Sequence, residues 1–427
     1  MGNNKLSVAE DRLINGWNPP KKGKLQYILA SLGPTALAVG LSMGPGSIGS
    51  ALQLGALTGY RMLWVMIIIA LAMAVESYIT NFVIYASHGE GEKASTLIQL
   101  FRKHLGVPAS IIIAVPGAVA FCFVILSQGT LVGSIVHNLF PAIPAWAAMA
   151  VSGPVMAFIF TREFETIKKM FRVLVGALTI LFLINGIISG PDFLGVLKGL
   201  VPSAPRSAAE GLAFAGVVGG SCGGMTFILQ SYGIRNSGLT EKRHLKLMKW
   251  DVLVTCIMFF VWNLGIYISA AAVLNPAGIE VSSAMQAALA LEPLAGPFAK
   301  YFMLIGILAA VLTSAGGVCT LNTCIITDVI GKEPNPRESP FMKKITLALC
   351  LLMSLSVLYK NFSSLKFVVT VMAGMTLAGP LVCIGILVMM FRKKIMRVEI
   401  PVWQKIVTLL ILGFNCYAAY NTLLGLI

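Results

Sequence analysis

The chain has 427 residues, of which 57% are hydrophobic and only 11% are charged. This composition excludes a soluble globular protein of this size and indicates an integral membrane protein, because long apolar stretches are typical of transmembrane helices. The formal net charge is +15, but the basic residues gather between the apolar stretches, which argues against a nucleic-acid partner.

Eleven apolar stretches of about 18–30 residues are each long enough to cross a bilayer as a helix. In chain order they cover residues 27–54, 62–86, 108–138, 142–161, 170–190, 210–233, 250–274, 296–328, 343–359, 364–391 and 402–425. The sequence therefore predicts an all-α integral membrane fold with eleven transmembrane helices and without a separate soluble domain.

The basic residues also predict the orientation in the membrane. If the N-terminus lies in the cytoplasm, most of the 32 Lys and Arg residues fall in inner segments, as the positive-inside rule requires. We therefore expect a multi-pass protein of the plasma membrane, surrounded by lipid bilayer, with a cytoplasmic N-terminus and an extracellular C-terminus. We expect it to be monomeric and to bind no nucleic acid.

Two of the spans contain residues that disfavour a continuous helix. The first contains Met43-Gly44-Pro45-Gly46-Ser47, and the sixth contains Gly219-Gly220-Ser221-Cys222-Gly223-Gly224. Pro lacks a backbone donor and Gly favours other conformations, so the backbone groups freed at these breaks are available to a ligand. The alternative is that the glycines only allow helices to pack closely.

The placement of the two breaks predicts the domain organisation. Breaks in spans one and six, each of which opens a block of five spans, are the pattern of two inverted repeats in a transporter. This pattern predicts an N-terminal tail at 1–26, a first repeat at 27–190 and a second repeat at 191–391. The eleventh span and its inner linker, at 392–427, lie outside the repeats.

The residues at and after the first break carry a resemblance to a known family. Gly44-Pro45-Gly46-Ser47, then Leu52-Gln53-Leu54-Gly55-Ala56 and Gly59-Tyr60-Arg61-Met62-Leu63-Trp64, are similar to the first-span signature of the Nramp metal-ion transporters. That signature reads Asp-Pro-Gly-Asn, Leu-Gln-Ala-Gly-Ala and Gly-Tyr-x-Leu-Trp. In the sixth span, Gly216-Val217-Val218-Gly219-Gly220 resembles the family's Gly-Ile-Ile-Gly-Ala. The resemblance implies the LeuT-like fold of the APC superfamily, with broken helices 1 and 6.

The departures from the family are as informative as the matches. Family members bind a transition metal through the Asp and Asn of the first break and a Met of the sixth span, and these positions are Gly44, Ser47 and Gly223 here. The family's proton-path and neighbouring polar positions in the third and sixth spans are also changed, to Ser127, Thr130, Met225, Thr226 and Gln230. These losses are similar to those of the Nramp-related magnesium transporters, a branch described as carrying Mg²⁺ and Mn²⁺ without proton coupling.

The resemblance thus implies a secondary transporter that is not an enzyme. On this resemblance we expect it to take up Mg²⁺, and also Mn²⁺, as a partly hydrated ion by alternating access, without coupling to protons. We expect no cofactor, since the metal ion is the transported substrate.

The ligand chemistry points the same way. A thioether favours transition metals, whereas hydroxyls, carbonyls and water favour Mg²⁺, which usually keeps several of its waters. Replacing Asp, Asn and Met by Gly44, Ser47 and Gly223 leaves more room in the site. It also removes the soft thioether ligand, so that the remaining ligands are hard oxygen atoms. A shift of two residues in the alignment would place Met225 at the Met position and restore a soft ligand, and this alternative stays open.

The candidate binding groups cluster at the two breaks. They are the Ser47 hydroxyl, the Gly44 carbonyl, carbonyls near Cys222 and Gly223, and the side chains of Thr226, Gln230 and Gln53. The alternative for Ser47 is a helix cap, and for Thr226 and Gln230 it is hydrogen bonding between helices.

One acid, Glu76, lies deep in the second span. An intramembrane carboxylate is typical of a functional site, so Glu76 is a candidate for electrostatic attraction of the cation or for gating. The alternative is a pair with a basic or backbone partner.

Two rival functions stay open. The first is an ordinary proton-coupled Mn²⁺/Fe²⁺ transporter, which would acidify the cell during uptake. The second is an amino-acid transporter of the same fold, in which amides at the first break would bind a substrate carboxylate.

Overall fold

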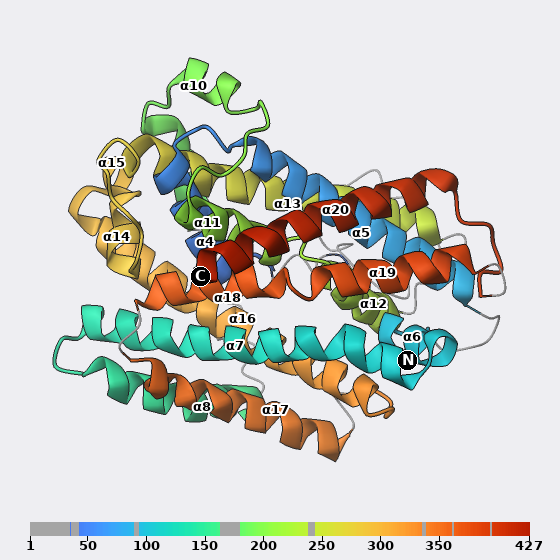
Figure 1. Ribbon diagram of the computed structural model, residues 1–427. Coiled ribbons are helices and arrows are strands. Elements are labelled where there is room, and N and C mark those ends of the chain that lie inside the picture. Colours follow the sequence, from blue (N-terminus) through green and yellow to red (C-terminus); the bar gives the residue numbers. More distant parts are fainter. Residues whose placement is uncertain are drawn as a thin grey trace, which may run out of the picture.

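The computed structural model describes residues 35, 42–88, 94–162, 180–237, 244–334, 339–360, 363–392 and 395–427. The regular elements in these ranges are all helices (Figure 1). Those of the N-terminal part are α4 (Pro45–Thr58), α5 (Trp64–Ser87), α6 (Leu97–Leu105), α7 (Val107–Leu139), α8 (Ala145–Arg162) and α10 (Phe193–Lys198). A further helical stretch covers residues 180–188.

The C-terminal part continues the bundle. It contains α11 (Ala208–Gly219), α12 (Met225–Ser237), α13 (His244–Val273), α14 (Ala284–Leu289), α15 (Glu292–Ala295), η1 (Gly296–Phe298), α16 (Ala299–Val329), α17 (Pro340–Leu352), η2 (Met353–Tyr359), α18 (Ser364–Met375), α19 (Gly379–Phe391) and α20 (Val402–Leu426). Within the described ranges, seven helices are long and apolar enough to cross a membrane.

Within the described residues the predicted spans coincide with these helices to within a few residues, and positions 27–34 and 36–41 of the first span lie outside that part. Two spans differ from expectation: the ninth ends as the 3₁₀ helix η2, and the tenth is interrupted between α18 and α19. The fifth span is seen only from residue 180, because residues 163–179 lie outside the described part. The predicted N-terminal tail at 1–26 also lies outside it.

The helix packing is reciprocal between the two halves of the chain. Helix α4, which follows the first break, packs against α13, and α12, which follows the second break, packs against α5. The third and eighth spans, α7 and α16, pack on each other, as do the fourth and ninth, α8 and α17. Two inverted repeats of five spans produce this pairing, so the packing has the arrangement that the breaks predict.

Short helices outside the spans lie at opposite ends of the bundle. Helices α10, α14 and α15 lie at one end and α6 at the other (Figure 1). Large apolar side chains on α7 and α20, such as Ile112 and Leu410, are exposed, as expected for helices that face lipid. The core therefore lies along the middle of the bundle, where the breaks also are.

Candidate functional site

The first break begins just before α4. Met43 and Gly44 are not helical, and Pro45 opens α4 in the first helical turn, where its missing amide is not needed. Gly44 occupies the N-cap position in extended geometry, without a side-chain cap. Ser47 is therefore not the capping residue, which excludes the alternative that the sequence left open.

The second break separates α11 from α12. Residues 220–224 form turns, in which Ser221 N and Cys222 N both donate to Val218 O at 3.1 and 2.8 Å. Gly224 has φ +76°, and a Cβ on it would lie 2.6 Å from the Gly379 backbone. Only glycine combines this φ with such a close contact.

A third break, which sequence reasoning missed, divides span ten. The backbone between α18 and α19 tightens into i→i−3 bonds, such as Thr376 N to Ala373 O at 3.0 Å. The Thr376 hydroxyl also donates to Ala373 O at 2.7 Å. Because α19 begins at Gly379-Pro380, the signal for this break was present in the sequence.

A cavity of about 50 Å³ lies where the first two breaks meet, beside α18. Its lining comes from the first break with the start of α4, from α7, from the second break with the start of α12, and from α16 and α18. The lining residues are Ser42, Gly44, Pro45, Gly46, Ser47, Phe121, Val124, Gln128, Gly219, Gly220, Ser221, Gly223, Met225, Thr226, Leu229, Val318, Met372 and Met375. None of these side chains is charged. Among the described residues there is also no cluster of three or more His, Cys, Asp or Glu side chains.

Two neutral oxygen groups are presented to this cavity by their neighbours. Ser47 donates its hydroxyl proton to Asn263 Oδ1 on α13 at 2.8 Å, so the lone pairs of its oxygen are left for a ligand. Gln128 donates its amide to Ser314 Oγ at 3.1 Å, and its buried Oε1 has no hydrogen-bond partner. Neither Gln128 nor Asn263 was predicted. The one clue in the sequence that Gln128 belongs to the site is its position between Ser127 and Thr130.

Three methionines are also among the lining residues: Met225, Met372 and Met375. Met225 packs its thioether against Gly117 on α7, where a Cβ would lie 2.7 Å from the sulfur. Met372 packs against both Gly46 and Gly220, with its sulfur 2.5 and 3.4 Å from the positions of their added Cβ atoms. Packing against glycines thus accounts for the placement of Met225 and Met372.

Three predicted binding residues lie outside the cavity lining. Gln53 lies further along α4 and is buried, with its Oε1 unpartnered. Cys222 is fully buried at the second break, and its carbonyl accepts from Asn415 at 3.4 Å. Gln230 donates instead to Asn81 Oδ1 at 2.9 Å and Thr35 Oγ1 at 3.1 Å, so it joins helices.

The two changed positions of the third span are neutral and internally bonded. Ser127 donates to Val124 O and Thr130 to Ser127 O, both at 2.8 Å. Both side chains are fully buried and lie outside the cavity lining. They carry no titratable group toward the cavity.

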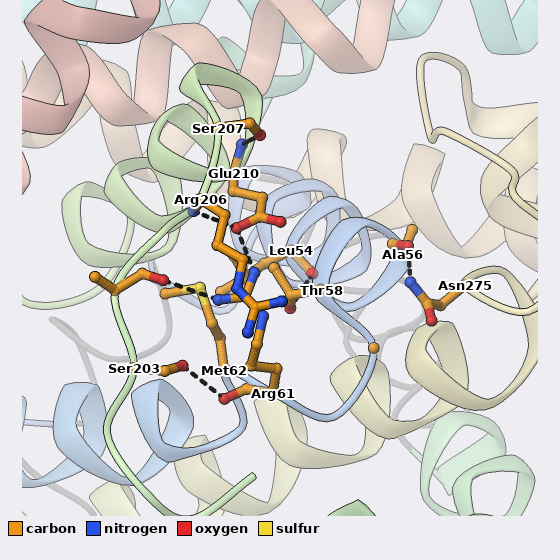
Figure 2. A network of polar contacts seen from close by, with 12 residues as sticks. Leu54, Ala56, Thr58, Arg61, Met62, Ser203, Arg206, Ser207, Glu210 and Asn275 are labelled. Carbon is orange, nitrogen blue, oxygen red and sulfur yellow. Dashed lines mark hydrogen bonds and ion pairs between the residues drawn. The ribbon is translucent and has the colours of Figure 1, made fainter.

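The ends of α4 and α11 away from the cavity are tied together (Figure 2). Arg61, which follows α4, forms an ion pair with Glu210 in the first turn of α11. Arg61 also donates to Ala204 O at 2.8 Å, and Glu210 accepts from Arg206 N at 2.7 Å. This network joins the two broken segments at one end of the bundle.

A helical membrane bundle with reciprocal repeats and a cavity between broken helices defines a membrane transporter fold. The family model described as natural resistance-associated macrophage protein-like matches residues 35–425, and the chain therefore belongs to the Nramp family.

Relatives of similar length match most of the chain. The chain is 22% identical to "Divalent metal cation transporter MntH" of Caldanaerobacter subterraneus over 420 residues, which are 94% of this chain and 95% of that protein. It is 24% identical to the MntH of Burkholderia ambifaria, over 92% and 90% of the two chains. The crystal structure of the Eremococcus coleocola manganese transporter with an aromatic bis-isothiourea compound matches with a TM-score of 0.72 at 18% identity, over 95% and 88% of the chains. This structural match confirms the LeuT-like fold.

Proposed function

We propose that the chain is a plasma-membrane transporter of divalent metal ions that takes up Mg²⁺, and also Mn²⁺, without proton coupling. Family membership and the names of its relatives support divalent metal transport. One observation carries the finer proposal: the described lining of the cavity offers neutral oxygen groups, from Ser47, Gln128 and Thr226, and no carboxylate. Such donors suit Mg²⁺ together with retained water.

The size of the cavity agrees with a hydrated ion. Water oxygens lie about 2.1 Å from Mg²⁺, so the centres of a complete inner shell fall within a sphere of roughly 40 Å³. The cavity volume of about 50 Å³ is comparable. A cavity of this volume would hold an ion with part of its water and few direct protein ligands.

The driving force requires no proton. The membrane potential already favours inward movement of a cation by about 2.3 kcal/mol per charge per 100 mV. The family positions linked to proton transfer are the non-titratable Ser127, Thr130 and Met225. Together these features favour uptake driven by the ion gradient and the potential alone.

Uptake into liposomes that contain the purified protein tests the proposal. We expect flux of Mg²⁺ and of Mn²⁺, mutual competition between the two ions, and no change in a pH dye inside the vesicle. Mn²⁺ flux that millimolar Mg²⁺ leaves unchanged, or acidification that accompanies flux, would contradict the proposal.

The cavity methionines favour a second candidate, a transporter selective for Mn²⁺ or Fe²⁺. Met372 lies between Gly46 and Gly220, where its thioether is close to both breaks. We expect Met225→Leu and Met372→Leu to keep Mg²⁺ and Mn²⁺ uptake within about twofold, because Leu conserves the volume of Met. Selective loss of Mn²⁺ uptake in either variant, with thermal stability retained, would show a sulfur ligand and favour the second candidate.

A further inference from the structure

Glu76 on α5 is the most unusual polar residue near the cavity. Its side chain is fully buried, and neither carboxyl oxygen has a hydrogen-bond partner. Among the described residues it is in no ion pair, so a basic partner is absent there, and the Gly224 amide is the backbone group that faces it. An uncompensated buried carboxylate is strongly unfavourable, and in membrane proteins such a group is typical of an ion pathway.

Glu76 lies directly behind the second break. Its carboxyl faces the Thr226 hydroxyl and the Gly224 amide from outside the cavity. Thr226 itself lines the cavity and donates to Ser221 O at 2.9 Å. Thr226 therefore separates the carboxyl of Glu76 from the space where an ion would bind.

A row of polar groups continues from Glu76 along the contact between α5 and α12. One turn further on, Thr80 lies 3.4 Å from Phe227 O, and Asn81 accepts from Gln230. Gln230 also donates to Thr35, whose amide donates to Asp251 Oδ2 at 2.9 Å. Since α12 runs from the break toward α6, which it contacts, this row runs from the cavity toward the α6 end of the bundle.

The charges around Glu76 leave its carboxylate available to a cation. The titratable side chains that face it are the thiols of Cys222, Cys256 and Cys383, on the second break, α13 and α19. Among the described residues no lysine or arginine neutralises it. A divalent cation supplies the compensating charge that these neighbours lack.

We propose that Glu76 is a second cation-binding group, which receives the divalent ion from the cavity and passes it along the polar row toward the α6 end. This proposal rests on the proposed function. The cavity lining supplies only neutral groups. The negative charge of the Glu76 carboxylate, which lies behind Thr226, is therefore needed to attract the ion out of the cavity.

Mg²⁺ uptake by liposomes that contain Glu76→Gln, Glu76→Asp or Glu292→Gln tests the role of the charge. We expect Glu76→Gln to lower the rate at saturating Mg²⁺ by at least about tenfold, because it removes an interaction that the moving ion needs. Glu76→Asp keeps the charge and retains uptake. Glu292→Gln removes an acid that is exposed on α15 and should match the wild type.

A thermal-unfolding measurement in detergent, with and without Mg²⁺, separates binding from folding. We expect Mg²⁺ to stabilise the wild type and Glu76→Asp, and to stabilise Glu76→Gln less. A wild-type rate for Glu76→Gln would overturn the proposal, as would equal loss of uptake and stability in both Glu76 variants. If the wild type moves neither Mg²⁺ nor Mn²⁺, the proposed function fails. In that case, thermal stabilisation by Mg²⁺ that depends on Glu76 would still support cation binding at Glu76. Absence of this stabilisation would overturn the Glu76 proposal.

Discussion

Gly219→Ala is expected to destabilise the protein and to abolish uptake. A Cβ on Gly219 would lie only 1.9 Å from the carbonyl oxygen of Met372, and a backbone atom cannot rotate away. Helices α11 and α18 would have to separate, at a cost of roughly 1–3 kcal/mol or more. Because both elements line the cavity, its shape changes as well. Thermal unfolding in detergent and Mg²⁺ uptake measure the two effects.

Gly374→Ala is the matched control for this variant. Gly374 lies on α18, and a Cβ on it would meet no atom within 4 Å. Alanine favours a helix over glycine by about 1 kcal/mol, so this variant should keep or slightly raise the unfolding temperature and keep uptake. Wild-type stability and uptake in Gly219→Ala would show that α18 does not approach the second break as closely as described.

Gly44→Asp is expected to change the ion preference toward Mn²⁺. The new carboxylate would stand at the N-cap of α4, where the backbone is extended and accepts any side chain, and where the helix N-terminus favours negative charge. A carboxylate beside the cavity replaces water as a ligand and holds the ion more tightly. We expect the KM for Mn²⁺ to fall at least about tenfold, which corresponds to about 1.4 kcal/mol, and the maximal Mg²⁺ rate to fall.

Gly278→Asp controls for the added charge. Gly278 is exposed, has φ +65° and has no atom within 4 Å of an added Cβ, and Asp tolerates this conformation better than most residues. We expect wild-type KM values for both ions. An unchanged ratio of Mn²⁺ to Mg²⁺ uptake in Gly44→Asp would mean that the ion does not pass close to the first break.

The sequence predicted the fold well because composition and local chemistry determine most of it. Apolar length set the spans, and Gly-Pro-Gly with a four-glycine run located two of the breaks. The third break was missed although Gly379-Pro380 marks it, because a single Gly-Pro pair also occurs in continuous membrane helices. What distinguishes it here is the contact of Gly379 with Gly224, which is tertiary.

The site was predicted only in part, for a related reason. Gly44, Ser47, Gly223 and Thr226 line the cavity because they belong to the breaks themselves. Gln53 and Gln230 were expected there from their spacing, but the direction of a side chain on a membrane helix depends on the neighbours that pack on it. Gln128 and Asn263 lie on continuous helices, and only the packing of α7 and α13 against the breaks brings them to the site.

The network of Arg61 and Glu210 has a mechanical consequence for the conformational cycle. Helices α4 and α11 pack on each other, and the ion pair with its supporting hydrogen bonds joins their ends away from the cavity. Because the two helices are joined both by their packing contact and by the Arg61–Glu210 network, we expect them to move as one rigid body. We therefore expect a rotation at either break to be transmitted to the other, so that the two sides of the cavity change shape together.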